Sequence, residues 1–403
     1  MFKIKTFNKI STEGLSLFKG GAYEAGDTVQ NPDALLVRSA HLSEIDIPPS
    51  VLAIARAGAG VNNIPVQACS ERGIVVFNTP GANANAVKEL VLAALFFSSR
   101  KIFDAAIWTK ALSGSIGQGS PAEAGAAESL STLVEKNKAS FAGPELAGKT
   151  LGVVGLGAIG VMVANDALAL GMNVIGYDPY ISVDAAWKLS GNVRNAESLD
   201  ALLSGADYVT IHIPYSEQTR DMLDAQKITR MKKGARLINL ARGGLVREAD
   251  VAAALDSGRL SLYVTDFPTP ELLSHTKVIC LPHLGASTPE AEVNCAVMAV
   301  KQLIDFLETG AVKNSVNFPR SSLPRQNNYR LLVANRNIPN MVGQITTLIA
   351  GKGINITDLV NHHQGDFAYN IIDTEQKLPP DALETLCAVN GIIRVRTIDP
   401  VPA

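Results

Sequence analysis

Two side chains that closely follow apolar runs of the chain could together bind an anion and transfer a proton. Arg242 follows the run Arg236–Leu240, and His283 follows a shorter run that ends at Leu281. A guanidinium binds a carboxylate through two parallel hydrogen bonds, and an imidazole exchanges protons near neutral pH. Ligands of parallel α/β sheets bind beyond the carboxyl ends of the strands, so both residues are candidates for an active site. An isolated arginine or histidine is more often a surface or structural residue, so neither identifies a site alone.

A glycine-rich sequence follows the apolar run Leu151–Val154. Gly155, Gly157 and Gly160 form a G-x-G-x-x-G motif, which opens a helix-like run and precedes a second apolar run, Asn173–Tyr177. The glycines permit a tight turn, close approach of a pyrophosphate and packing of helix on strand. The first amide groups of the helix then favour phosphate. We therefore expect a dinucleotide-binding site here.

Asp178 ends the second run, about 20 residues past the motif, where a carboxylate holds the ribose hydroxyls of the adenosine. The same carboxylate repels a 2′-phosphate. Pro179 and Tyr180 follow it, in place of an arginine that would bind that phosphate. The sequence therefore predicts NAD as the cofactor rather than NADP.

The bulk composition excludes several classes of function. The 403 residues suit two or three domains. A formal net charge of -2, without clustered basic residues, argues against nucleic-acid binding. Four scattered cysteines form no C-x-x-C pair, so neither a disulfide framework nor a metal site is expected. No stretch reads as a signal peptide or a membrane span, and we expect a cytoplasmic protein without membrane contacts.

The elements that would position these residues alternate between strand-like and helix-like patterns. From Thr150 onward the alternation predicts a doubly wound parallel sheet. Its strands are expected at Leu151–Val154, Asn173–Tyr177, Tyr208–Ile213, Arg236–Leu240 and Leu262–Asp266. Residues 2–78 also have an α/β pattern, and residues 112–140 are expected to be an exposed segment with some helix.

Two long helices and a small tail domain complete the predicted organisation. Helices are expected at Val87–Lys101 and from Pro289 to about Leu307, the second with Thr288 as N-cap. The tail gives strand, helix, strand, strand, helix, strand, which is typical of a split-βαβ domain. Its runs are Arg330–Ala334, Met341–Ala350, Ile354–Val360, Ala368–Asp373, Pro380–Val389 and Ile392–Ile398.

Several ordered motifs between Leu35 and Phe318 resemble the D-isomer-specific 2-hydroxyacid dehydrogenase family. They are Arg56–Asn63, Phe77–Glu89, the glycine motif with Asp178, His212–Pro214, Asn239–Gly244 and Pro282-His283. The resemblance implies a Rossmann-type nucleotide domain inserted in a split α/β substrate domain. The expected limits are residues 1–100 with 287–318 for the substrate domain, 101–286 for the NAD-binding domain, 319–328 for a linker and 329–403 for the tail domain.

The resemblance also implies catalytic roles. Arg242 would bind the substrate carboxylate, and His283 would be the general acid/base. The family's partner for this histidine is a glutamate three residues after a phenylalanine, but here a proline stands three after Phe267 and Glu271 comes one later. We assign the role to Glu271. Asp266 is the competing candidate, and a third possibility is that His283 acts without a carboxylate partner.

Cofactor and substrate contacts follow from the same resemblance. The expected cofactor-binding residues are Gly155, Gly157, Ala158, Ile159, Gly160, Asp178, His212, Pro214, Leu240, Ala241, Asp266 and Gly285. The expected substrate-binding residues are Arg38, Ser39, Arg56, Gly58, Ala59 and Asn83. Members of the family that act on phosphoglycerate carry similar arginines, whose planar fork suits a phosphate. The implied activity is oxidation of 3-phospho-D-glycerate to 3-phosphooxypyruvate, the first step of L-serine biosynthesis.

The tail resembles an ACT domain, a module that pairs side by side and binds amino acids between subunits. This implies a homo-oligomer, at least a dimer, with L-serine as a candidate effector near Asn337 and Asn355. Asn340 stands where a glycine is usual, and a pairing domain without ligand is an equal alternative. His362-His363 lack a third metal ligand in motif spacing and are expected in a solvated turn.

Two other functions remain open from the sequence. A glyoxylate or hydroxypyruvate reductase of the same family would not need Arg38 and Arg56, and usually lacks a tail sensor. An NADH-sensing regulatory protein with this fold would bind the cofactor without turnover. Comparing 3-phosphoglycerate, glycerate and 2-hydroxyglutarate as substrates separates the readings.

Overall fold

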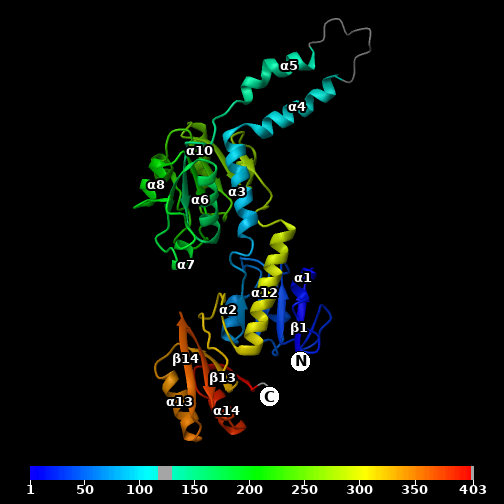
Figure 1. The fold of residues 1–403 in the computed structure, drawn as a ribbon, viewed down its shortest axis with the longest axis vertical. Coiled ribbons are helices and arrows are strands. Elements are labelled where there is room, and N and C mark those ends of the chain that lie inside the picture. Colours follow the sequence, from blue (N-terminus) through cyan, green and yellow to red (C-terminus); the bar gives the residue numbers. More distant parts are fainter. Residues whose placement is uncertain (117–128, 401–403) are drawn as a thin grey trace. The chain divides into compact units, whose positions relative to one another are not determined.

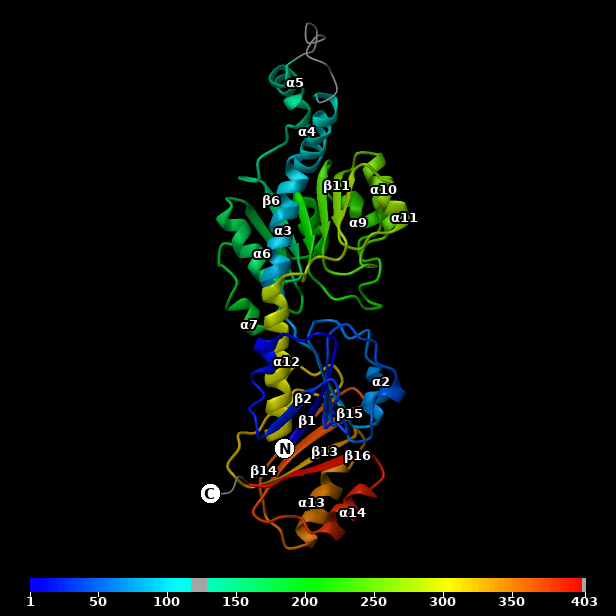
Figure 2. The same ribbon diagram turned by 90° about the vertical axis from the view of Figure 1, so that its right-hand side faces the viewer.

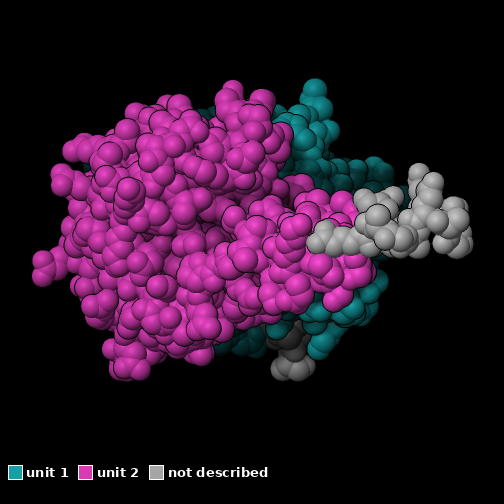
Figure 3. All heavy atoms as spheres, turned by 90° about the horizontal axis from the view of Figure 1, so that it is seen from above, with its two compact units in different colours: residues 1–83, 288–403 teal, residues 84–287 magenta. Residues whose placement is uncertain are grey.

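The computed structural model describes residues 1–116 and 129–400, which fall into two compact units (Figure 3). The first unit comprises residues 1–83 and 288–403, and the second comprises residues 84–287. Each unit has hydrophobic clusters of its own. Within the described part of the chain, no helix is both long enough and apolar enough to span a membrane.

The second unit contains a seven-stranded parallel sheet in the order β12-β11-β10-β9-β6-β7-β8. Its strands are β6 (Thr150–Val154), β7 (Asn173–Tyr177), β8 (Arg194–Asn195), β9 (Tyr208–Ile211), β10 (Ala235–Asn239), β11 (Leu260–Thr265) and β12 (Val278–Cys280). The five strands that the sequence predicts are all confirmed, with ends that differ by at most two residues. The strand order reverses at β6, and ligands of such sheets bind beside that reversal.

Helices cover both faces of this sheet (Figures 1 and 2). They are α3 (Ala84–Ser99), α6 (Ala158–Ala169), α7 (Val183–Ala186), α8 (Leu199–Gly205), α9 (Ala225–Arg230), α10 (Glu248–Asp256) and α11 (Pro270–Leu273). One hydrophobic cluster joins α3 and α6 to the sheet, and another joins α8, α9 and α10 to it. These buried faces hold the strand ends, and the loops that follow them, in fixed positions.

Within the second unit, a helical arm follows α3. It consists of α4 (Ile102–Ile116) and α5 (Leu130–Asn137), followed by the short helix η2 (Lys138–Phe141). Helix is thus present in the predicted exposed segment, and residues 117–128 lie outside the described residues. The arm presents several exposed apolar side chains, namely Ile102, Phe103, Ile107 and Leu130.

The first unit begins with a five-stranded parallel sheet in the order β2-β1-β3-β4-β5. Its strands are β1 (Phe2–Phe7), β2 (Tyr23–Gly26), β3 (Ala34–Val37), β4 (Ala53–Arg56) and β5 (Val75–Phe77), with helices α1 (Thr12–Leu15), η1 (Glu44–Asp46) and α2 (Val66–Glu71). The long helix α12 (Pro289–Thr309) packs against α1 and this sheet (Figures 1 and 2). As predicted, Thr288 caps α12, and its Oγ1 accepts a hydrogen bond from Ala291 N at 3.1 Å.

The C-terminal part of the first unit is a four-stranded antiparallel sheet in the order β14-β15-β13-β16. Its elements are β13 (Tyr329–Arg336), α13 (Met341–Gly351), β14 (Ile356–Gln364), β15 (Phe367–Thr374), α14 (Pro380–Cys387) and β16 (Ile392–Ile398). The predicted split-βαβ order is confirmed. The turn predicted for His362 and His363 is wrong, because both residues lie in β14, and His362 Nδ1 is 3.2 Å from Ser321 Oγ.

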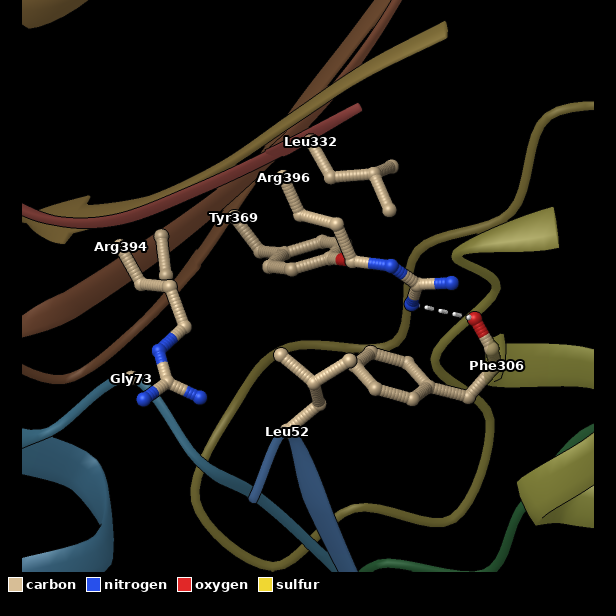
Figure 4. Close-up of a pocket in the computed structure, with 8 residues that line it drawn as sticks. Leu52, Gly73, Phe306, Leu332, Tyr369, Arg394 and Arg396 are labelled. Carbon is tan, nitrogen blue, oxygen red and sulfur yellow. Dashed lines mark hydrogen bonds between the residues drawn. The ribbon is translucent and has the colours of Figure 1, made fainter. Parts of the chain in front are cut away.

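Arginines of this sheet hold the C-terminal end of α12. Arg396 donates to the carbonyl of Phe306 at 3.1 Å (Figure 4). It also donates to the carbonyl of Leu307. Arg330, which forms a buried ion pair with Asp373, donates to Thr309 O at 2.8 Å. The last carbonyls of a helix lack partners within it and carry partial negative charge, so guanidinium groups stabilise this end. The tail sheet is therefore fixed to the helix by charge-assisted hydrogen bonds.

The compact units divide the chain at other points than the limits predicted from the sequence. Helix α3 belongs to the second unit, whereas residues up to 100 are predicted for the substrate domain. Within the predicted linker 319–328, Ser321 and Leu323 are buried, so this segment packs against its surroundings. The finer division into substrate, cofactor, linker and tail segments stays a prediction.

Candidate active site

Six neighbouring strands of the second unit's sheet are each followed by a predicted site residue. In sheet order from β12 to β7, these are His283, Asp266, Arg242, His212, Gly155 and Asp178. All six strands run parallel, so their carboxyl ends meet along one edge of the sheet. The structure therefore collects the predicted cofactor and catalytic residues of this unit at one edge.

The glycine loop between β6 and α6 packs too closely for side chains at two of its three positions. Gly155 has a φ of +90°, and a Cβ there would lie 2.6 Å from the carbonyl oxygen of His212. A Cβ on Gly160 would lie 1.9 Å from Gly155 O. By contrast, a Cβ on Gly157 would meet nothing within 4 Å, so this stretch of backbone faces open space. Such a loop, at the start of a helix, fits a pyrophosphate.

The carboxylate of Asp178 is held beside this loop by two backbone amides. Its Oδ2 accepts from Leu156 N at 2.8 Å, and its Oδ1 accepts from Tyr180 N at 2.9 Å. The side chain is half-buried, and each oxygen keeps a lone pair for a further donor. A fixed carboxylate next to an open glycine loop fits the ribose hydroxyls of NAD. The residues present at this edge thus suit the dinucleotide.

His212 is a neutral member of the site. Its Nε2 lies 3.0 Å from Thr210 Oγ1, and Nδ1 is buried without a hydrogen-bond partner among the described residues. Burial lowers the pKa of His212 from its ordinary value of 6.5 to about 3. The imidazole therefore carries no charge at neutral pH, and it is the backbone carbonyl of His212 that lies against Gly155. Pro214, two residues later, is exposed.

Arg242 lies in a loop that is held by an asparagine. The buried Asn239 donates from Nδ2 to Arg242 O at 2.9 Å, and its Oδ1 accepts from Ala241 N at 3.2 Å. The guanidinium of Arg242 is exposed, with Nη1 donating to Ala241 O at 2.6 Å. Leu240, two residues earlier, is buried. Asn239 was not among the predicted site residues, although an asparagine at a strand end is the signal for such a clamp.

Asp266 joins the loop after β11 to the loop after β12. Its Oδ2 accepts from Gly285 N at 3.3 Å, and its backbone oxygen accepts from His283 N at 3.1 Å. Burial raises the pKa of Asp266, and the charges of His283 and Arg242 oppose this shift. Oδ1 is buried without a partner among the described residues. A buried carboxylate oxygen without a hydrogen-bond partner can accept a hydrogen bond from a ligand, which suits the predicted cofactor contact.

His283 has an unusual backbone and an exposed imidazole. Its φ is +51°, in the left-handed region, and its ring packs on Phe267 with centroids 5.0 Å apart. Glu271 is exposed in the first turn of α11, and no hydrogen bond or ion pair between described residues joins it to His283. The structure thus brings Asp266 and Phe267 next to His283. The partnership of Glu271 with His283 stays a prediction.

The predicted substrate residues of the first unit cluster after β3 and β4. Arg38 Nη2 lies 2.5 Å from Glu292 Oε1. Arg56 donates from Nε to Arg38 O at 3.1 Å and from Nη1 to Gly60 O at 2.6 Å. A Cβ on Gly58 would lie 2.7 Å from Arg56 Nη1, so a side chain at position 58 would shift this guanidinium. Arg56 is thus engaged in holding the loop that carries Arg38.

The other predicted substrate residues are less constrained. Ser39 N donates to Asn8 Oδ1 at 3.1 Å, which fixes the loop after β3. Ala59 O accepts from Asn78 Nδ2 at 2.6 Å. Asn83, the last residue of this segment of the unit, is half-buried. These three residues lie on loops that the sheet of the first unit positions.

The two asparagines predicted to bind an effector lie at opposite ends of the tail sheet. Asn337 follows β13 and donates to Gly365 O at 3.1 Å. Asn355 precedes β14 and donates to Glu375 Oε1 at 3.0 Å. The strand register places Arg336 and Gln364 at one end and Ile356 at the other, so one chain does not bring both asparagines together.

Comparison with known proteins relates the chain to dehydrogenases. Residues 123–285 match the family described as D-isomer specific 2-hydroxyacid dehydrogenase, NAD binding domain. D-3-phosphoglycerate dehydrogenase of Bacillus subtilis is 34% identical over 337 residues, which are 79% of this chain and 59% of that protein. The protein of the same name from Methanocaldococcus jannaschii is 33% identical over 354 residues, which are 85% of this chain and 62% of that one.

Solved structures show the same similarity. The cofactor (NAD+)-bound 3-phosphoglycerate dehydrogenase of Entamoeba histolytica has a TM-score of 0.60 and 25% identity, covering 78% of this chain and 98% of that one. The chain spans about three fifths of the length of the two curated relatives. From the glycine loop, the strand-end residues and these matches together, the chain carries, within residues 123–285, the NAD-binding domain of the D-isomer-specific 2-hydroxyacid dehydrogenase family.

Proposed function

We propose that the chain is an NAD-dependent dehydrogenase that oxidises 3-phospho-D-glycerate to 3-phosphooxypyruvate, the first step of L-serine biosynthesis. The observation that carries this proposal is the edge of the parallel sheet where Arg242, His283 and the glycine loop all follow strand ends. Similarity to proteins named D-3-phosphoglycerate dehydrogenase supports the choice of substrate. The exposed Arg38 supplies a cation suited to a phosphate.

The oxidation removes a hydride from C2 and a proton from the hydroxyl on the same carbon, leaving a ketone. In this proposal His283, whose imidazole is exposed, accepts the hydroxyl proton. NAD, when bound, supplies the hydride acceptor. Arg242 binds the carboxylate and withdraws electron density as the carbonyl forms. Arg38 binds the phosphate.

The positions of these groups depend on residues that do not react. Asn239 fixes the backbone of the Arg242 loop through two hydrogen bonds. Phe267 packs on the ring of His283, and the backbone oxygen of Asp266 accepts a hydrogen bond from the backbone amide of the same histidine. In the first unit, Arg56 and Asn63 donate to the carbonyl oxygen of Arg38. Catalytic geometry of this kind is maintained by packing and by hydrogen bonds beneath the reacting groups.

We further propose that the protein is a homo-oligomer, at least a dimer, that works in the cytoplasm and responds to L-serine through its tail domain. The exposed apolar side chains of the α4–α5 arm favour a protein partner, and a second copy is the simplest one. The four cysteines are free, which suits a reducing compartment. Because Asn337 and Asn355 lie at opposite ends of the sheet, a site that uses both would need two copies of the domain.

Spectroscopic measurement of NADH formation tests the proposed reaction. Purified protein should reduce NAD with 3-phosphoglycerate at a kcat/KM well above that with D-glycerate or D-2-hydroxyglutarate. His283→Asn should remove the activity while leaving NAD binding, measured by calorimetry, in place. NADH oxidation by glyoxylate or hydroxypyruvate without activity on 3-phosphoglycerate would identify a reductase instead. Tight NADH binding without turnover of any of these compounds would identify a sensor.

A further inference from the structure

Arg38, the residue proposed to bind phosphate, already has an anionic partner within the chain. Its Nη2 lies 2.5 Å from Oε1 of Glu292, in the first turns of α12. The two side chains are 39% and 44% exposed, respectively. An ion pair that reaches solvent can exchange its carboxylate for a dissolved anion without a change in the fold. The pair therefore engages one nitrogen, Nη2, of the guanidinium that the substrate would need.

Only the side chain of Arg38 has freedom to move. Its backbone follows β3, and its carbonyl oxygen accepts from Arg56 Nε at 3.1 Å and from Asn63 Nδ2 at 3.4 Å. Asn63 also donates to Ala40 O at 2.7 Å, which fixes the next part of the loop. The guanidinium thus starts from a fixed Cα, and the identity of its partner decides where it points.

Glu292 is stable as a free carboxylate once it leaves Arg38. It lies near the N-terminal end of α12, where the unpaired amides and the helix dipole favour negative charge. Its 44% exposure also leaves it hydrated. Displacing Glu292 from Arg38 therefore costs the energy of one exposed ion pair, and it leaves no buried charge behind.

We infer that Glu292 is an internal competitor for Arg38, which the anionic tail of the substrate must displace. This inference rests on the proposed function and adds a residue that sets substrate affinity. A phosphate offers three acceptor oxygens and up to two charges, whereas Glu292 presents one oxygen to the guanidinium. Substrates with an uncharged tail do not bind the Arg38 guanidinium, so Glu292 does not affect their affinity. Glu292 would thus lower the affinity for anionic tails and keep inorganic anions off the site.

Glu292→Gln is the decisive variant, with Glu290→Gln as its matched control. Glu290 lies in the same turn and loses the same charge, but it is exposed and has no ion pair among the described residues. Glu292→Gln should lower the KM for 3-phosphoglycerate by about twofold to fivefold, the equivalent of one exposed ion pair. It should lower the Ki of inorganic phosphate as a competitive inhibitor by a similar factor. The KM for D-glycerate should stay within error, and Glu290→Gln should change none of these constants.

A double-mutant cycle with Arg38→Ala locates the effect. If Glu292 competes for Arg38, Glu292→Gln has no effect on KM in the Arg38→Ala background. A higher KM for 3-phosphoglycerate in Glu292→Gln would overturn the inference, because Glu292 would then be orienting Arg38 for the substrate. An equal effect of Glu290→Gln would also overturn it, because the change would then come from general charge.

The failure of this inference is distinguishable from failure of the proposed function. If wild-type protein oxidises 3-phosphoglycerate and Glu292→Gln has unchanged constants, the function stands and the competitor role is wrong. If wild-type protein does not oxidise 3-phosphoglycerate, calorimetric titration of the full chain with inorganic phosphate still tests the ion pair. Tighter phosphate binding by Glu292→Gln than by Glu290→Gln would support the competition, and equal binding would refute it.

Discussion

Replacing His212 by glutamine should reduce the loss of folding stability at low pH, because the buried imidazole contributes to that loss. The pKa of His212 is lowered from 6.5 to about 3 by burial of the ring. The folded protein therefore keeps the imidazole neutral at a pH where the unfolded chain binds a proton. Since the unfolded state binds more protons below pH 6.5, stability falls as pH falls from there toward 3.

The size of the effect follows from the two pKa values. Between pH 7.5 and pH 5, protonation of the unfolded state lowers the free energy of unfolding by about 2 kcal/mol, at about 1.4 kcal/mol per pH unit below 6.5. His212→Gln lacks the titrating group and should lose that much less over the same range. The lost packing of the ring lowers stability equally at both pH values, so it cancels in the difference.

Urea unfolding monitored by tryptophan fluorescence is a suitable assay. Trp108 and Trp187 are the two tryptophans of the chain, and both belong to the second unit, which also contains His212. The drop in urea midpoint from pH 7.5 to pH 5 should be about 1 M smaller in the variant, for a slope of about 2 kcal/mol per M. His363→Asn, at an exposed position of β14, is the control and should behave like wild type. Equal drops for wild type and His212→Gln would refute the reasoning.

Three further predictions concern the proposed reaction. Asp178→Ala should raise the KM for NAD and reduce the preference for NAD over NADP. The carboxylate that the loop amides fix would then no longer hold the ribose or repel a 2′-phosphate. A wild-type enzyme that turns over faster with NADP than with NAD would contradict this. Arg38→Ala should raise the KM for 3-phosphoglycerate about tenfold or more while leaving D-glycerate unchanged, and equal losses would show that Arg38 does not bind phosphate. Glu271→Gln should lower kcat at least about tenfold and move the acidic limb of the pH–rate profile, which is assigned to His283, to lower pH, if a carboxylate supports that imidazole. An unmoved pH–rate profile would end this assignment.

The helices and strands could be predicted closely because their buried faces require apolar residues in a regular pattern, which the sequence shows directly. Runs of buried apolar residues such as Leu151–Val154 and Ala34–Val37 coincide with β6 and β3 to within a residue. The strand predicted to reach Ile213 ends at Ile211, since apolar character continues into the loop that packs behind the glycine motif. The turn predicted at His362-His363 is wrong for the opposite reason. These residues lie in the edge strand β14, whose exposed positions give no apolar alternation to detect.

The contacts that set the site could not be predicted in the same way. Arg38 and Glu292 are separated by 254 positions in the chain, and no periodicity links them. The docking of Arg396 on the end of α12 is equally hidden, because an arginine in a β-strand is ordinarily exposed. Asn239 begins one of the motifs, but its role as a clamp depends on the hydrogen bonds that its side chain makes to the loop after β10. Long-range polar partners depend on the packed fold, so local patterns do not specify them.

The motif alone does not identify which carboxylate supports His283. A proline stands where the family has its glutamate and Glu271 comes one residue later, so the resemblance alone assigns the role to the nearest glutamate. In the structure Glu271 is exposed on α11, while Asp266 and Phe267 are the residues beside His283. Burial raises the pKa of Asp266, and the charge of His283 opposes that shift, so the two side chains are electrostatically coupled. A carboxylate that must stabilise an imidazolium has to sense its charge. Asp266 meets that condition, which makes Asp266→Asn the comparison that gives the Glu271→Gln result its meaning.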